Sequence, residues 1–134
     1  MNPAITGERS RKGDEWYRWI VQSISGYAIF STDLHNRIVT WDEGAEAIFG
    51  YRREDVKGEN ARFIFTPEDI KNHAPEAELA SATRKHFALD ERWHVKKDGT
   101  IFWASGLMMP LLDDHRQHVG FVKVVRECPE GART

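Results

Sequence analysis

The sequence has 134 residues, of which 40% are hydrophobic and 30% charged, a composition typical of one globular domain. The net charge is −2 and the basic residues are scattered, which argues against binding to nucleic acid or to an anionic membrane surface. The single cysteine, Cys128, cannot form an intrachain disulfide, and no apolar run is long enough to span a bilayer, so we expect a cytoplasmic protein.

The N-terminal residues predict a flexible segment followed by a helix. Residues 1–13 hold Gly, Pro, Ser and charged residues without periodicity, so we expect this segment to be flexible. Residues 14–24 show apolar positions at helical spacing, which predicts an amphipathic helix with Asp14 as its N-cap. The apolar stripe of this helix is formed by Trp16, Ile20 and Ile24.

The middle of the chain predicts a hairpin and several short helices. Residues 27–42 contain two β-rich runs, YAIFSTD and RIVTWD, separated by turn-forming residues. Two short helical stretches then end at Gly50 and Gly58. A further helix should begin at the N-cap Thr66, and Pro75 should interrupt it.

The last third of the chain predicts three more strands. The turn Asp98-Gly99 separates HFALDERWHVKK from TIFWASGLMMPLL, and the last strand is HVGFVKVVREC, which ends at Cys128. Residues 129–134 should form a tail. Two strands, short helices and three further strands, joined by hairpins, predict an α+β fold with an antiparallel sheet.

Two stretches carry a resemblance to a known family. IVTWDEGAEAIFGYRREDVKG resembles the first half of a PAS domain and KKDGTIFWASGLMMPL its second half, and the resemblance covers roughly residues 15–128. It implies a PAS domain over residues 14–128, with a five-stranded antiparallel sheet, short helices on one face and the N-terminal helix on the other. It also implies a non-catalytic sensory or interaction module of a bacterial histidine-kinase system.

The resemblance raises the question of two cofactors, flavin and haem. GENARF is similar to the motif around the photoreactive cysteine of flavin-binding light sensors, but Ala61 stands in place of that cysteine, which argues against a flavin photoadduct. The positions of flavin-binding amides are occupied by His94, Ala104 and Val125. The segment DIKNH resembles the proximal-histidine segment of rhizobial oxygen-sensing kinases, so His73 is a possible haem ligand.

A third possibility is a small polar ligand. Strand alternation places Asp90, Arg92 and His94 on one face, which faces the pocket by resemblance to the family. The candidate pocket residues are Asp90, Arg92, His94, Phe102 and Ala104. Arg92 and His94 match the oxygens of a carboxylate or phosphate, although Arg92 could instead pair with Asp90 or a helix carboxylate. We see no metal-ligand spacing and no catalytic motif.

The opposite face of the predicted sheet offers a docking surface. It should present Trp93, Val95, Trp103, Val122 and Val124. The stripe of the N-terminal helix is the natural cover, either from the same chain or exchanged between two chains of a homodimer. The open hypotheses are a sensory module that binds a small ligand or dimerises, a haem sensor, and a purely structural dimerisation module.

Overall fold

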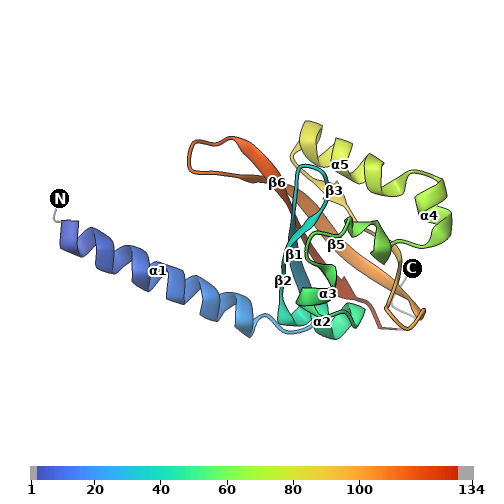
Figure 1. Ribbon diagram of the computed structural model, residues 1–134, viewed down its shortest axis with the longest axis horizontal. Helices are drawn as coiled ribbons and strands as arrows, with labels where there is room; N and C mark the ends of the chain where they lie inside the picture. Colours follow the sequence, from blue (N-terminus) through green and yellow to red (C-terminus); the bar gives the residue numbers. More distant parts are fainter. Residues whose placement is uncertain (1–2, 130–134) are drawn as a thin grey trace.

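The computed structural model describes residues 3–129, which form an antiparallel sheet, a set of short helices on its inner face and one projecting N-terminal helix (Figure 1). The elements in chain order are α1 (Pro3–Ser23), β1 (Tyr27–Asp33), β2 (Ile38–Trp41), α2 (Glu43–Phe49), α3 (Arg53–Val56), the 3-10 helix η1 (Ala61–Ile64), α4 (Pro67–Lys71), α5 (Ala74–Lys85), β3 (Ala88–Leu89), β4 (Arg92–Val95), β5 (Ile101–Leu112) and β6 (His118–Glu127). The α+β class predicted from the sequence is confirmed.

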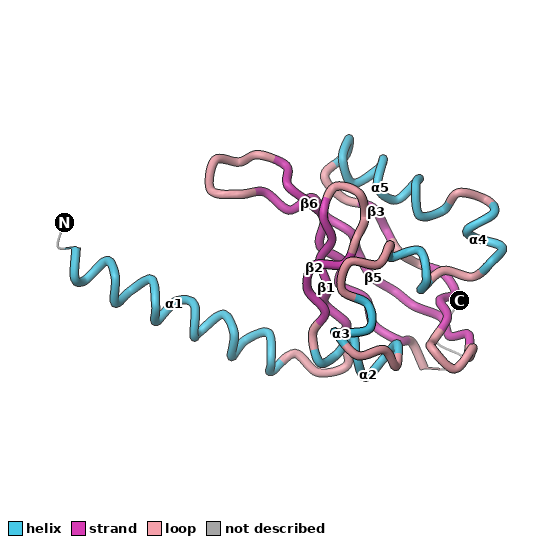
Figure 2. The backbone as a smooth tube through the Cα atoms, in the orientation of Figure 1, coloured by secondary structure: helices cyan, strands magenta, loops and turns pink. Residues whose placement is uncertain are grey.

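The sheet has the order β2-β1-β6-β5-β3, and β4 also pairs with β5 (Figure 2). Every strand pair is antiparallel. Leu89 pairs with Leu107 and Arg92 with Ala104, so β3 and β4 follow one register along β5. They are two parts of one edge strand. Counted in this way, the six strands of the sheet correspond to the five that were expected.

The turns form at the residues that the sequence indicated. Asn36 closes the β1–β2 hairpin with a positive φ of 63°, a conformation that asparagine tolerates better than most residues. Gly99 has a φ of 90° in the turn before β5, and the Asp98 carboxylate accepts a hydrogen bond from the Thr100 amide at 2.9 Å. These local preferences fix the register of both hairpins.

The short helices begin and end at capping residues. Asp42 accepts a hydrogen bond from the Ala45 amide at the start of α2, and Gly50 ends that helix in the left-handed conformation. Thr66 caps α4 through the Asp69 amide, and α5 begins after His73. The predicted interruption near Pro75 is therefore present, because α4 stops and a separate helix starts.

Helix α1 differs from the prediction in its length and placement. It begins at Pro3 rather than near Asp14, so Asp14 lies inside the helix and is not its N-cap. The preceding residues include Glu, Arg and Lys, which favour helix, and a proline suits the first helical turn. The helix projects away from the sheet instead of covering its other face (Figure 1). The predicted tail falls almost wholly outside the described residues, as do residues 1–2 of the predicted flexible segment.

The core lies between the inner face of the sheet and the short helices. Its largest members are Phe30, Trp41, Phe49 and Phe102, whose rings contact one another at centroid distances of 5.0 to 6.5 Å. A smaller apolar cluster under α5 contains Ala82, Ala88, Met108 and Phe121. Among residues 3–129, no helix combines the length and apolar character needed to cross a membrane.

Candidate functional site: a buried charge cluster

The inner face of the edge strand carries three polar residues. The structure places Asp90 and His94 wholly inside the protein and leaves Arg92 partly exposed beside them. Alternation along the strand explains this placement, because residues two apart share a face; on β5, Arg92 lies opposite Ala104 and His94 opposite Phe102. Asp90 is fixed by its amide, which donates to the Gly106 carbonyl at 2.9 Å.

Two charged residues that the sequence analysis did not single out complete the cluster. Lys123 lies on β6 and Glu78 on α5, and both are almost fully buried. A signal for each was present in the sequence. Lys123 lies two residues from Phe121 and from Val125 on β6, so it shares the inward face with these apolar residues. Glu78 lies four residues before the buried Ala82, so both are on the inner side of α5.

Lys123 and Arg92 each contact the same two carboxylates. The Lys123 Nζ lies 2.7 Å from Glu78 Oε1 and 3.2 Å from Asp90 Oδ2. The Arg92 Nε lies 2.8 Å from Glu78 Oε2 and 3.0 Å from Asp90 Oδ1. Arg92 also reaches Asp69 on α4 at 3.5 Å. Arg92 is therefore paired with Asp90 and with helix carboxylates, which was the alternative to ligand binding.

His94 lies between two acceptors. Its Nε2 is 2.7 Å from Asp90 Oδ2, and its Nδ1 is 2.8 Å from the carbonyl oxygen of Ile64. A neutral ring has one N–H and donates to one of these oxygens, whereas the cationic ring donates to both. His94 therefore connects Asp90 to the backbone of η1.

The cluster pulls the pKa values of its two carboxyls apart. Burial raises the pKa of Glu78 to about 7, against the opposing charge of Lys123 and with a further rise from Asp90. Burial acts in the same direction on Asp90, but the charge of Lys123 and the hydrogen bond with His94 outweigh it and hold the pKa of Asp90 well below its ordinary value. One carboxyl is thus firmly ionised and the other titrates near neutrality.

Aromatic rings enclose the charges. The Lys123 Nζ lies 4.8 Å and the Arg92 Cζ 5.6 Å from the ring centroid of Phe65, so both cations face the negative face of that ring. His94 packs edge-on against Phe65 and tilted against Phe102. Asp90, Arg92 and His94, three of the predicted pocket residues, therefore lie together beside these rings, and their role in ligand binding stays a prediction.

The remaining pocket candidates are also buried. Phe102 belongs to the aromatic core and Ala104 lies beside it on the inner face. Ala61, at the position of the photoreactive cysteine in the similar motif, is buried in η1 and offers no thiol. His94, Ala104 and Val125, at the positions of flavin-binding amides, face the interior as well.

The possible haem ligand His73 lies on the surface. Its side chain is 80% exposed and its nearest charged partner is Glu76, at 4.0 Å. A proximal haem ligand must face an apolar pocket, whereas His73 sits between α4 and α5 at a position with a φ of 61°. This placement gives the haem hypothesis no support.

The outer face of the sheet carries the expected apolar residues. Trp93 pairs directly with Trp103, and their rings meet at 5.3 Å in an edge-to-face arrangement. Leu107 pairs with Val124, so these side chains lie on the same face. The expected members on this face are Trp93, Val95, Trp103, Val122 and Val124. Leu89, at 59% exposure, lies next to them.

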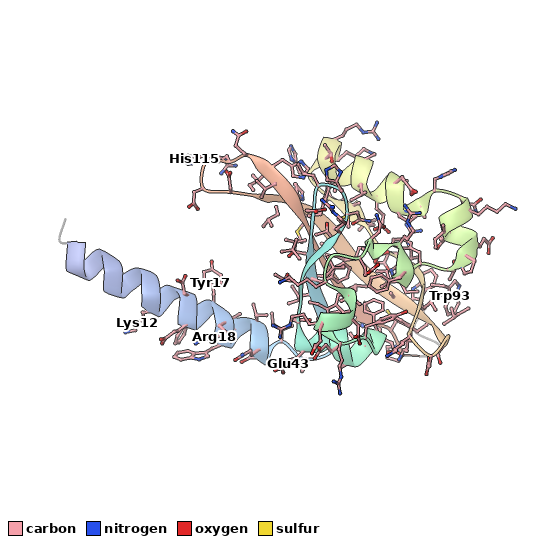
Figure 3. The ribbon with its side chains drawn as sticks, in the orientation of Figure 1. Lys12, Tyr17, Arg18, Glu43, Trp93 and His115 are labelled. Carbon is pink, nitrogen blue, oxygen red and sulfur yellow. The ribbon has the colours of Figure 1, made fainter. Side chains whose placement is uncertain are left out.

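Helix α1 leaves its apolar stripe open. Trp16 is 60% exposed, and Ile20 and Ile24 are exposed as well. Figure 3 shows Tyr17 and Arg18 on a helix that extends from one end of the molecule, while Trp93 lies at the opposite end. Within one chain, α1 therefore does not cover the outer face of the sheet.

Comparison with known proteins gives a consistent assignment. The family model described as PAS domain matches residues 25–128. Two-component system protein A of Emericella nidulans is 37% identical over 117 residues, which are 87% of this chain and 17% of that protein. The chain spans less than a fifth of the length of the curated relatives it matches.

Two solved structures show the same fold. The PAS domain of a Colwellia psychrerythraea protein has a TM-score of 0.71 and 24% identity, over 92% of this chain and 97% of that one. The blue-light activated histidine kinase of Erythrobacter litoralis has a TM-score of 0.66 and 23% identity, over 82% of this chain and 35% of that one.

The antiparallel sheet, the short helices on its inner face and the family match together define a sensory domain of signalling proteins. The chain belongs to the PAS domain family, as its resemblance predicted. PAS domains are generally non-catalytic. The bacterial origin and the cytoplasmic location expected from the sequence remain predictions.

Proposed function

We propose that this PAS domain relays a signal as a homodimer in which α1 of each chain covers the outer sheet face of the other. The observation that carries the proposal is the exposure of two apolar surfaces at opposite ends of one chain. Trp16 and Ile20 are exposed on α1, and Leu89 and Leu107 are exposed on the sheet. Large apolar surfaces of this kind mark interaction sites in soluble proteins.

A second copy of the chain is the occupant that suits both surfaces. Helix α1 extends away from the end of its own chain at which Trp93 lies (Figure 3). In a two-fold dimer, the helix stripe of each chain would cover the outer sheet face of the other, so both surfaces would be buried in both chains. The aromatic residues on both surfaces suit the buried centre of an interface, where tryptophan and tyrosine are enriched.

The ion pairs in the interior favour a domain that relays a signal over one that binds a metabolite. Arg92, the residue best suited to hold an anionic ligand, is engaged by Glu78 and Asp90 at 2.8 and 3.0 Å. A ligand would have to break these ion pairs and supply equal compensation. The signalling context is a two-component or histidine-kinase system, which is supported by the names of the Emericella nidulans and Erythrobacter litoralis proteins.

The test is the mass of the purified chain in solution. One chain has a mass of 15.5 kDa, so the dimer should appear at twice that value by light scattering. Trp16→Glu combined with Ile20→Glu should give the monomer mass, because a charge in the stripe prevents burial of the helix. Gln22→Glu, on the opposite side of α1, is the matched control and should stay dimeric. An unchanged mass in the double variant would refute the helix-mediated dimer.

A further inference from the structure

Glu78 and Asp90 are two carboxylates that share the same two cations. Each has one oxygen within 3.2 Å of the Lys123 Nζ and the other within 3.0 Å of the Arg92 Nε. Two carboxylates held this close in a buried site repel each other, and one of them then retains a proton to higher pH than a carboxyl in water.

The contacts of the two carboxylates determine which one takes the proton. Asp90 has a third partner, because His94 Nε2 lies 2.7 Å from its Oδ2. The third partner of Glu78 is the Asp90 carboxylate itself, which raises the pKa of Glu78 by its charge and by a side-chain hydrogen bond, whereas the Glu78 Oε2 accepts no hydrogen bond from residues 3–129 although the Arg92 Nε is near. The proton therefore belongs on Glu78, as the rise of its pKa to about 7 also indicates.

Helix α5 depends on this residue for much of its attachment. Glu78 connects α5 to Lys123 on β6 and to Arg92 on β4. The apolar contacts of the helix are of two kinds: Ala82 and Leu79 meet Met108 and Phe121 in the smaller cluster, and Ala74 at the start of the helix packs against the main core. The smaller cluster is separate from the main aromatic core. Among the described residues, the ion pairs between α5 and the sheet are those of Glu78, so a change in its charge acts directly on this contact.

We propose that Glu78 is a proton-operated latch for helix α5, closed when its carboxyl is protonated and weakened when the proton leaves near neutral pH. The charged groups that face it are Lys123 from β6, Asp90 from the segment before β4, and Arg92 from β4. His94 and Asp69 lie one contact further away, through Asp90 and Arg92 respectively.

The direction of the switch follows from the two environments of the carboxyl. In the closed state the pKa of Glu78 is about 7, and when α5 leaves the sheet it returns to the ordinary value near 4.5. The open state therefore loses the proton first, and rising pH favours opening between these two values. The open-to-closed ratio should rise about twentyfold between about pH 5.5 and about pH 7.5 by this linkage.

Hydrogen exchange of the full chain tests the latch and does not depend on dimerisation. After correction for the intrinsic pH dependence of exchange, amides in Ala74–Lys85 of the wild type should lose protection by about twentyfold over that range. Glu78→Gln, which imitates the protonated carboxyl, should show no such loss. Glu76→Gln on the exposed side of the same helix is the control and should behave as the wild type.

Two results would overturn the proposal. One is a pH dependence that persists in Glu78→Gln, which would assign the proton to another group such as His94. The other is a midpoint near 4.5 when the Glu78 carboxyl carbon of the wild type is titrated directly by NMR, a measurement that does not need the glutamine variant to fold. A midpoint near 7 supports the latch.

Discussion

The replacement of Lys123 by methionine tests whether the buried charges stabilise the fold together. Lys123 is 1% exposed, and its ammonium is the shortest contact of Glu78, at 2.7 Å. Methionine fills a similar volume without a charge, so the variant leaves Glu78 and Asp90 facing each other with Arg92 as their only shared cation. Breaking a buried pair in this way costs about 3–5 kcal/mol of unfolding free energy.

The companion variant separates the ion pair from simple packing. If Glu78→Met is added to Lys123→Met, the uncompensated carboxylate disappears, while Asp90 keeps Arg92 and His94 as partners. Replacement of both partners of a buried pair by apolar side chains is often neutral. The double variant should therefore be more stable than Lys123→Met alone, by about 1 kcal/mol or more.

Urea denaturation followed by tryptophan fluorescence measures these differences, with the slope of the transition as a check that the unfolded state is unchanged. The loss in Lys123→Met should shrink at lower pH, because Glu78 can then take up a proton and shed its charge. The reasoning fails if Lys123→Met costs less than about 1 kcal/mol, or if the second substitution destabilises the protein further.

Two further predictions concern the backbone. Gly106→Ala would drive a methyl group into the carbonyl of Val124 on the neighbouring strand, so it should cost more than about 2 kcal/mol in denaturation. Gly13→Ala, with open space around it on helix α1, should cost nothing, because alanine favours helix over glycine. Asp42→Ala removes the acceptor for the Ala45 amide at 2.7 Å and should cost about 1–2 kcal/mol in thermal unfolding, whereas Asp42→Asn, which keeps an oxygen there, should retain most of the stability.

The strands, turns and caps could be predicted from the sequence because their causes are local. Asn36 and Gly99 adopt the left-handed conformation that their positions in the hairpins require. Thr66 caps the helix that follows it, since the hydroxyl and the amide it accepts from are three residues apart. Alternation likewise placed Asp90 and His94 inside.

The charge cluster and the direction of α1 could not be predicted in the same way. Glu78 and Lys123 are 45 residues apart, and only the pairing of β6 with β5 and the packing of α5 bring them to 2.7 Å. No local rule indicates that Arg92 meets two carboxylates rather than a ligand. The helix stripe was visible in the sequence, but the direction in which α1 leaves the domain has no local signal.

The inner cluster and the outer face share strand β6. Lys123 points inward between Val122 and Val124, which point outward, because side chains alternate along a strand. In the proposed dimer, a movement of Lys123 that follows a change in Glu78 would therefore act on the backbone that presents both valines to the second chain. If the proposed dimer forms on this face, the coupling runs in reverse as well: a dimer contact that shifts this segment of β6 would alter the contacts of Lys123 and with them the proton affinity of Glu78. A proton near neutral pH and a second chain would then act on one strand from its two faces.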